Sequence, residues 1–280
     1  MKRLEAAALL FGLTAASAGV ALCAVSERIR IRPYVCRDRR IQKPIRLLHV
    51  SDLHASPFGR NQQELLNLTD ALRPDAILLT GDICDNRVSN RPAYVYLSQV
   101  AERYPCFYVS GNHEVYTGRL PRIKQHLRGL GIRVLEGEGE TVALNGTPLY
   151  IGGIDDPYAF PDAKHRLWED QLADVNCRIG NCYAILLTHR PERVNDYAET
   201  AFDLVLAGHA HGGQVILPGL LNGLYAPHQG FFPKVAGGCF ALSPIQTMIV
   251  SRGLSTYVRP RVWNRPELTL ITLLPKGESE

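Results

Sequence analysis

The sequence predicts an α/β fold in which two mixed β-sheets pack as a sandwich flanked by helices, preceded by an N-terminal transmembrane helix. Three observations support this prediction. Short apolar runs alternate with helical patterns from Ile45 onward. Strand-like runs near the end of the chain follow one another without intervening helices, which favours two sheets over one open sheet. An uncharged run of 20 residues, Ala6–Val25, is long enough to cross a bilayer.

The expected elements of the body follow from the spacing of apolar residues. A stripe of leucines predicts a helix over Asn61–Leu72, and Pro74 ends it. Further helices are expected at Arg91–Glu102, Arg119–Leu130 and Leu167–Val175. Strands are expected at Ile45–Ser51, Ala76–Thr80, Cys106–Ser110, Thr141–Leu144, Leu149–Gly153, Ala184–His189, Asp203–His209, Gln214–Leu217, Gln246–Val250 and Leu268–Leu273.

The chain divides into an apolar, a basic and a mixed region. We expect a membrane anchor or signal segment over residues 1–25, a basic juxtamembrane segment over 26–43, and one domain over 44–280. The basic segment holds seven Lys and Arg against two acidic residues, whereas the net charge of the whole chain is +4. The positive charge therefore lies beside the apolar run, which suits anionic lipid headgroups and gives no indication of nucleic-acid binding.

The apolar run has more than one interpretation. It can remain as a single-pass anchor in the cell membrane, or it can be a cleaved signal peptide. A lipoprotein signal ending at Cys23 is disfavoured, because Leu22 stands where a small residue is expected. The basic residues after the run slightly favour the cytoplasmic face for the domain, and an exported domain stays open as the alternative. The sequence does not define an oligomeric state.

Polar residues able to bind metals follow five of the strand-like runs. In α/β sheets, sites gather at the carboxyl ends of strands, where loops bring distant segments together. The five groups are Asp52-Leu53-His54, Gly81-Asp82, Gly111-Asn112-His113-Glu114, Thr188-His189 and Gly208-His209-Ala210-His211. Each group alone is common in proteins, but the five together in this order predict a metal site.

The residue types in these groups indicate which metals would bind. Carboxylate, imidazole and amide oxygen together suit divalent cations of borderline hardness, such as Mn²⁺, Fe²⁺ or Zn²⁺. Asp52 and His54 share one side of an extended strand end, because residues i and i+2 lie on the same face. His209 and His211 repeat this spacing. No cysteine belongs to the set, which argues against a structural zinc site.

The ordered motifs resemble those of the calcineurin-like metallophosphoesterase superfamily. The matching blocks are SDLH (51–54), GDICD (81–85), GNHE (111–114), THRPE (188–192) and GHAHGGQ (208–214). The resemblance implies a four-layer α/β fold and two divalent ions bridged by Asp82. It implies that Asp52, His54, Asp82 and His211 hold one ion, and that Asp82, Asn112, His189 and His209 hold the other. By the same resemblance, His113 is the catalytic histidine, and Asn112 also stabilises charge on the phosphoryl oxygens.

One departure from the superfamily pattern narrows the substrate class. Protein Ser/Thr phosphatases continue the second block as Asp-Arg-Gly, whereas here Asp85 is followed by Asn86-Arg87-Val88, which favours a phosphodiesterase or small-molecule branch. The stretches 208–219 and 226–230 resemble the membrane-attached bacterial branch. That branch includes hydrolases of UDP-2,3-diacylglucosamine in lipid A biosynthesis. The resemblance thus implies a phosphorylated small-molecule or lipid substrate, with phosphodiester or pyrophosphate bonds, at a membrane.

Two other functions stay open. One is a phosphomonoesterase acting on nucleotides or envelope polymers, and the other is a non-catalytic metal-binding membrane scaffold. His113 argues against the scaffold, because binding alone does not require that histidine. His228 could line the substrate pocket. Phe231, Phe232 and the Leu220–Tyr225 stretch could face a lipid chain or the membrane, although ordinary packing is the simpler interpretation.

Overall fold

The computed structural model of the protein describes residues 24–160, 166–258 and 261–277. Among these residues, no helix combines the length and the apolar character needed to cross a bilayer. Residues 1–23, which hold most of the expected N-terminal span, lie outside the described part of the chain.

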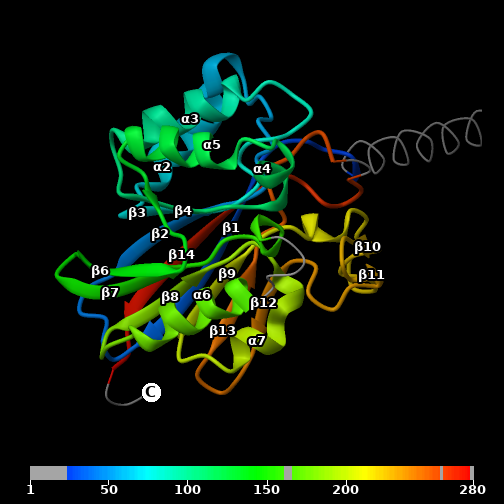
Figure 1. The fold of residues 1–280 in the computed structure, drawn as a ribbon. Helices are drawn as coiled ribbons and strands as arrows, with labels where there is room; N and C mark the ends of the chain where they lie inside the picture. Colours follow the sequence, from blue (N-terminus) through cyan, green and yellow to red (C-terminus); the bar gives the residue numbers. More distant parts are fainter. Residues whose placement is uncertain (1–23, 161–165, 259–260, 278–280) are drawn as a thin grey trace, which may run out of the picture.

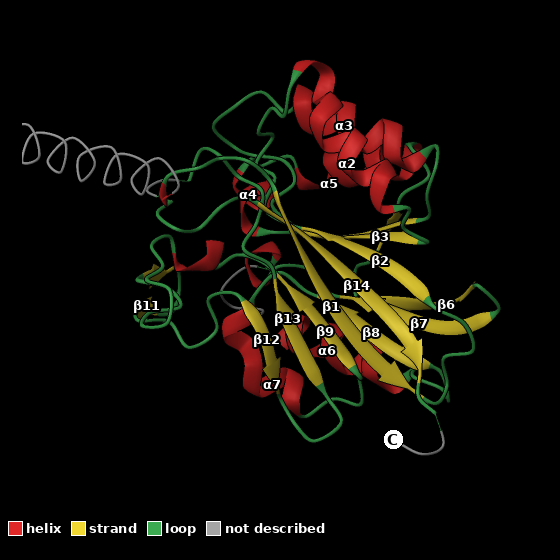
Figure 2. Ribbon diagram, turned by 180° about the vertical axis from the view of Figure 1, so that it is seen from behind, coloured by secondary structure: helices red, strands yellow, loops and turns green. Residues whose placement is uncertain are grey.

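Two six-stranded sheets form the centre of the molecule (Figures 1 and 2). The first sheet contains β1 (Arg30–Asp38), β2 (Ile45–Val50), β3 (Ala76–Thr80), β4 (Cys106–Val109), β5 (Arg133–Val134) and β14 (Glu267–Pro275). The second contains β6 (Glu138–Leu144), β7 (Thr147–Gly153), β8 (Tyr183–Leu187), β9 (Leu204–Ala207), β12 (Gly238–Ala241) and β13 (Thr247–Val250).

Both sheets are mixed, as the sequence predicts. The order of the first is β1-β14-β2-β3-β4-β5, and that of the second is β12-β13-β9-β8-β7-β6. β2, β3, β4 and β5 run parallel, while β14 is antiparallel to β2 and parallel to β1. In the second sheet, β7, β8, β9 and β13 run parallel, and the edge strands β6 and β12 are antiparallel. The parallel strands of each sheet therefore end at one edge.

Helices cover the outer face of each sheet, so the expected four layers are present (Figure 1). α2 (Gln63–Leu72), α3 (Arg91–Ala101) and α5 (Leu120–Gly129) cover the first sheet, and α6 (Arg166–Cys177) and α7 (Val194–Ala198) cover the second. Along β2, Leu48 and Val50 pack towards the helices, whereas Ile45 and Leu47 pack between the two sheets. Successive strand residues point to opposite faces, which is why the buried strands are apolar throughout.

Shorter elements complete the described chain. They are η1 (Arg60–Gln62), α4 (Asn112–Tyr116), η2 (Pro157–Ala159), η4 (Pro191–Arg193), η5 (His211–Gly213) and the hairpin strands β10 (Tyr225–Ala226) and β11 (Gly230–Phe231). α4 begins directly at the third polar group of the sequence, and η5 begins within the fifth.

Two features of the fold differ from the sequence-based expectation. The expected strand over Gln214–Leu217 is wrong, since Val215 and Leu217 form only isolated bridges. The backbone there leaves η5 through Gln214 at a φ of 62°, which is not an extended conformation. The basic segment over 26–43 contains an unexpected strand, β1, which pairs with β14 over its whole length. The sheet therefore extends into the region that the sequence marks only by its charge.

Candidate active site

The seven predicted ligands lie together at the carboxyl ends of five strands. Asp52 and His54 follow β2, Asp82 follows β3, Asn112 follows β4, His189 follows β8, and His209 and His211 follow β9. A hydrogen bond of 2.7 Å from His189 Nδ1 to the Thr80 carbonyl oxygen joins the second sheet to the first at this edge. The aligned ends of two packed sheets thus supply one site, as strand-end placement predicts.

The ligand atoms form two adjacent groups. Asp52, His54 and His211 make up one group, and Asp82, His189 and His209 the other, with the ligand atoms of each group within 4.8 Å of one another. Asp82 Oδ2 faces both groups, at 3.6 Å from His54 Nε2 and 3.2 Å from His189 Nε2. Asn112 Oδ1 also lies 3.2 Å from His189 Nε2. The arrangement places Asp82 between the groups and Asn112 beside the second.

Hydrogen bonds fix the tautomers of two of these histidines. His189 Nδ1 must carry its proton, because its partner is a carbonyl oxygen. His54 Nδ1 is likewise the donor, because it lies 2.8 Å from Asp85 Oδ2. In the neutral form of each ring, Nε2 therefore carries the lone pair and faces Asp82, as in metal-binding histidines held by a second hydrogen bond.

The buried atoms at the centre fit cations. Among the described residues, His54 Nε2 and Asp82 Oδ2 are buried without a hydrogen-bond partner. Lone pairs that face one another away from water are unfavourable unless a positive charge lies between them. Carboxylate, imidazole and amide donors are the ligand types that divalent ions of borderline hardness take.

The pKa values follow the same charge pattern. Burial lowers the pKa of His211 to about 3, against the opposing effect of Asp52. Burial also tends to lower the pKa of His189, but the facing Asp82 carboxylate outweighs it and raises the pKa to about 10. The Asp82 position thus attracts positive charge, whereas His211 stays neutral and keeps a lone pair available for a ligand bond.

The backbone of the site is strained. Five of the seven predicted ligands have a positive φ, namely Asp52 (51°), His54 (46°), Asp82 (51°), His209 (65°) and His211 (47°). This region is uncommon for residues other than glycine, and it costs on the order of 1–3 kcal/mol for each residue held there. Such strain persists where the surrounding structure fixes it, and it clusters at functional sites.

Two glycines allow the loops to approach this closely. A Cβ atom on Gly208 would lie 1.9 Å from Ser51 Oγ and 2.4 Å from Asp52 Oδ2. A Cβ atom on Gly111 would lie 2.3 Å from Asp82 Oδ1. Any side chain at either position would displace a predicted ligand, so the glycines belong to the construction of the site.

The predicted catalytic histidine, His113, lies beside the ligand groups at the start of α4. Its Nδ1 is 3.0 Å from Asp85 Oδ2 and 2.9 Å from Asn86 Oδ1, and both of these atoms are acceptors. Nδ1 therefore carries a proton, and Nε2 is left for a second partner. The ring is partly exposed, whereas His54, 4.4 Å away between ring centroids, is buried.

Asp85 is shared by a predicted ligand and the predicted catalytic residue, since its Oδ2 contacts both His54 and His113. We expect Asp85→Asn to lower both metal affinity and kcat by ~10–100-fold, because an amide cannot accept from both imidazoles with equal strength. Metal titration and steady-state kinetics on the same preparation measure the two effects. Asp174→Asn, on the exposed side of α6, is the matched control. Unchanged values for Asp85→Asn would remove Asp85 from the site.

Glu114 holds the loops that carry Asp82 and Asn112. Its Oε2 accepts from the backbone N–H of Asp82 (2.8 Å) and of Gly111 (3.0 Å), and its Oε1 accepts from that of Cys84 (2.9 Å). The side chain is fully buried. Its role is therefore to satisfy three loop donors from a single side chain.

Glu114→Gln is expected to lower the free energy of unfolding by about 1–3 kcal/mol, because the new amide group presents a donor to at least one backbone N–H. Urea denaturation in the absence of metal measures this change. Glu102→Gln, at an exposed position, should leave the free energy of unfolding unchanged within about 0.5 kcal/mol. Equal stability of the Glu114→Gln variant and the parent would show that the three hydrogen bonds contribute nothing to the free energy of unfolding.

A second polar cluster lies at the site, and His228 is the member of it that the sequence analysis named as a possible pocket residue. Arg190 and Asp156 form a buried ion pair, with Arg190 Nη2 3.0 Å from Asp156 Oδ1. Arg190 Nη1 lies 3.1 Å from His209 Nε2 and 2.8 Å from His228 Nδ1, so the pair borders the second ligand group. Tyr158 contacts His228 from outside, with its hydroxyl 2.8 Å from Nε2. The sequence could have indicated Asp156 as a site residue, because it comes shortly after the strand β7, just as the predicted ligands follow their strands.

The comparisons with known proteins agree with this geometry. The model of the calcineurin-like phosphoesterase family matches residues 45–213, which include all seven predicted ligands. The chain belongs to this family. An uncharacterized metallophosphoesterase of Aquifex aeolicus is 32% identical over 89% of this chain and 93% of its own length. The phosphodiesterase YaeI of Escherichia coli is 29% identical over 89% of this chain and 88% of its own.

The name of a third relative describes it as a transmembrane protein. It is the transmembrane protein with metallophosphoesterase domain of Danio rerio, 29% identical over 82% of this chain and 53% of its own length. Family membership makes the chain a metal-dependent phosphoesterase, and the family uses two divalent metal ions. The two ligand groups of the site match that number.

Proposed function

We propose that this phosphoesterase is a two-metal hydrolase of phosphodiester or pyrophosphate bonds in a small-molecule or lipid-linked substrate at a membrane. The observation that carries the proposal is the pair of ligand groups that Asp82 Oδ2 faces, with His113 beside them and no hydrogen bond to its Nε2 among the described residues. Two divalent ions bound there supply Lewis-acid activation of water and neutralise charge on the phosphoryl group.

The residues of the chain take the following roles in the proposal. Asp52, His54, Asp82 and His211 hold one ion, and Asp82, Asn112, His189 and His209 hold the other. In the proposal, the Asn112 amide nitrogen also donates to a phosphoryl oxygen. His113 Nε2 gives a proton to the leaving oxygen, while Asp85 holds its ring through Nδ1. Asp85 is thus a positioning residue.

The charge at the edge of the site favours a diester over a monoester. Arg190 Nη1 lies 3.1 Å from His209 Nε2 in the second ligand group, and the Arg190 charge is already paired with Asp156. Burial, together with the nearby Arg190 charge, lowers the pKa of His228, which keeps this histidine neutral. A phosphomonoester carries an additional negative charge that these two residues do not balance.

The rim of the site offers planar and apolar contacts. The rings of Tyr116 and Tyr158 lie 5.8 Å apart, and Tyr158 lies 5.7 Å from the ring of His228. Tyr116 and Tyr158 are 50% and 40% exposed, so they can contact the part of the substrate that extends beyond the phosphate. UDP-2,3-diacylglucosamine, with a planar base and acyl chains, is a substrate of this kind.

A membrane location agrees with the apolar run over Ala6–Val25 and with the name of the Danio rerio relative. The basic residues that follow the run favour the cytoplasmic face for the domain, and export after signal cleavage is the alternative. Accessibility of a C-terminal tag to a membrane-impermeant reagent in intact cells distinguishes the two orientations.

The proposed function is tested with the full chain purified in neutral detergent with Mn²⁺. We expect faster turnover of bis(p-nitrophenyl) phosphate than of p-nitrophenyl phosphate, and release of UMP from UDP-2,3-diacylglucosamine. Preference for the monoester would instead identify a phosphomonoesterase. No turnover of any of the three with metal bound would identify a metal-binding scaffold.

A further inference from the structure

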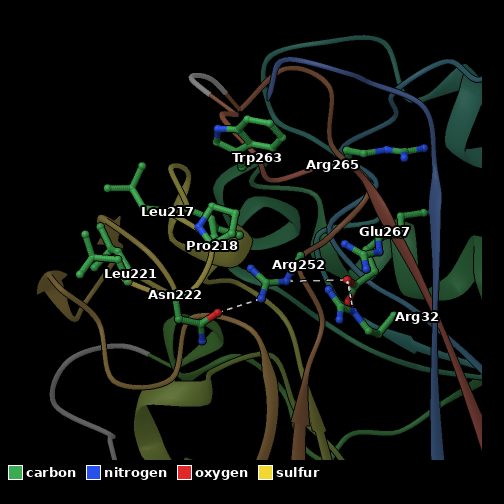
Figure 3. A pocket seen from close by; sticks show the side chains of 13 residues that line it. Arg32, Leu217, Pro218, Leu221, Asn222, Arg252, Trp263, Arg265 and Glu267 are labelled. Carbon is green, nitrogen blue, oxygen red and sulfur yellow. Dashed lines mark hydrogen bonds and ion pairs between the residues drawn. The ribbon is translucent and has the colours of Figure 1, made fainter. Parts of the chain in front are cut away.

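A cavity of about 680 Å³ lies apart from the metal-binding groups, between the first sheet and the loop that follows η5 (Figure 3). This volume is within the range of small-ligand sites. The lining residues come from β1, from the start of β14 and from the loops that contain Leu217, Arg252 and Trp263. None of the seven predicted metal ligands lines it.

One wall of the cavity is strongly cationic. Arg30, Arg32, Arg252 and Arg265 line it, with Glu267 as the one acidic lining residue. Figure 3 shows Arg32 and Arg252 converging on Glu267, at 3.2 Å and 3.8 Å. A single carboxylate cannot neutralise four guanidinium groups, so the wall keeps a net positive charge that complements an anion.

Arg252 has capacity for a further acceptor. Its Nη2 donates to Asn222 Oδ1 at 2.8 Å, whereas its Nη1 is buried without a hydrogen-bond partner among the described residues. Burial lowers the pKa of Arg252, and the neighbouring Arg32 charge lowers it further. A bound anion would accept a hydrogen bond from Nη1 and would reduce the repulsion between the guanidinium groups.

The opposite wall of the cavity is apolar and open to solvent. Figure 3 shows Leu217, Pro218 and Leu221 facing the arginines across the cavity. Leu217 is 43% exposed, Leu220 83% and Trp263 38%, so large apolar side chains remain in water at this mouth. The side chains of Phe231 and Phe232, 69% and 67% exposed, extend the apolar surface on the neighbouring hairpin. The sequence alone favoured packing for these aromatics, and the structure places both in solvent.

The start of the described chain fixes where this surface lies relative to the apolar run. The Trp263 backbone N–H donates to the Ala24 carbonyl oxygen at 2.6 Å, so the chain enters the domain next to the cavity. Figures 1 and 2 both show the first described residues and the β10–β11 hairpin at the same end of the molecule. Ala24, near the end of the uncharged run, therefore lies beside Trp263 at an arginine-lined, apolar-rimmed cavity.

We propose that this cavity binds the headgroup of an anionic phospholipid, with its phosphate against Arg32 and Arg252 and its acyl chains along Leu217, Leu220 and Trp263. Arginine matches a phosphate by paired hydrogen bonds, and exposed apolar side chains at the rim match the interface just below it. The site orients the domain on the membrane surface and is separate from the hydrolytic reaction. It therefore goes beyond the proposed function and does not depend on which phosphoester is cleaved.

The test uses tryptophan fluorescence of the full chain in neutral detergent. The chain has two tryptophans: Trp263 lines the cavity, and Trp168 is 1% exposed within the core. We expect dihexanoyl phosphatidylglycerol to change the emission saturably, and dihexanoyl phosphatidylcholine to bind at least fivefold more weakly. Trp263→Phe should remove the signal. Equal binding of the two lipids would overturn the proposal, because the arginines would then contribute no selectivity.

Substitutions in each wall of the cavity test the contributions of the two walls to lipid binding separately. Arg252→Gln and Arg32→Gln should each weaken phosphatidylglycerol binding by on the order of fivefold, which is the effect of one basic residue near a headgroup. Arg122→Gln, on the exposed face of α5, is the matched control and should bind as the parent does.

Leu220→Ser tests the apolar wall at a position too exposed to affect folding. It should weaken binding of the lipid but not of glycerol 3-phosphate, which has the phosphate and no acyl chain. Glycerol 3-phosphate binding as tightly as phosphatidylglycerol would identify a site for a free phosphate and overturn the lipid assignment. Hydrolysis of bis(p-nitrophenyl) phosphate by all of these variants should match the parent, so failure of the cavity proposal is distinct from failure of the proposed function.

Discussion

Replacing Asp82 with Asn should lower kcat/KM by at least ~10³-fold and reduce the bound metal below two ions per chain. Asp82 Oδ2 faces His54 and His189 from a fully buried position, so it is the atom that we propose serves both ligand groups. An amide at this place removes the negative charge that balances two adjacent cations. The Lewis-acid activation of water that depends on those cations is then lost.

Metal analysis by mass spectrometry, together with kinetics on bis(p-nitrophenyl) phosphate, measures this prediction. Asp155→Asn is the matched control, because Asp155 is also buried and charged but pairs with Lys124 at 2.6 Å, outside both ligand groups. The control should lose stability and keep its metal. An Asp82→Asn enzyme with two metals and full turnover would falsify the shared-ligand assignment.

Replacing His113 with Ala should leave two metals bound and slow the hydrolysis of an alkyl phosphodiester by ~10²–10⁴-fold. His113 is not one of the seven predicted ligands, and its Nδ1, the atom nearest His54's partner Asp85, is occupied by Asp85 and Asn86. Its Nε2 is the proton donor in the proposed function. An alkoxide needs this proton more than p-nitrophenolate does, so the loss should be smaller with a nitrophenyl ester.

The dependence on the leaving group separates proton donation from a purely structural role. His126→Ala is the matched control, since His126 is an exposed histidine on α5 that contacts the Tyr94 ring edge to face and lies outside the site. Equal losses with the alkyl and nitrophenyl esters would contradict the assignment of His113 as the acid. Partial recovery by added imidazole with the alkyl ester alone would support it.

The sequence predicted that the candidate ligands lie close together because their order follows a simple rule of α/β folds. Asp52, Asp82 and His189 each come just after a buried apolar run, and parallel strands bring such positions to one edge. The positive φ of Asp52 and Asp82 could not be predicted, because the strain is imposed by loops that are distant in sequence. The same holds for the contact between Arg190 and His228, which joins segments 38 residues apart.

The errors in the fold prediction also have physical causes. Arg30-Ile31-Arg32 alternates charged and apolar residues as an edge strand does, but its high charge makes it resemble a juxtamembrane segment. The stretch Gln214–Leu217 is apolar enough for a strand, yet Gly213 just before it turns the chain at a φ of 65°. In both places, whether a strand forms depends on the segment with which it can pair, and the local composition does not identify that segment.

The position of β14 has a consequence for how the chain is made. This strand follows the other strands of the described chain in sequence, but it lies between β1 and β2, so residues 30–38 pair with residues 267–275. During synthesis, neither β1 nor the adjacent edge of β2 can find its partner until the final strand has left the ribosome. Contacts this distant in sequence close slowly, and they leave strand edges exposed to other chains in the meantime. A chain that lacks residues 267–275 therefore leaves the edges of β1 and β2 that face β14 without their partner, even though every predicted metal ligand precedes that strand.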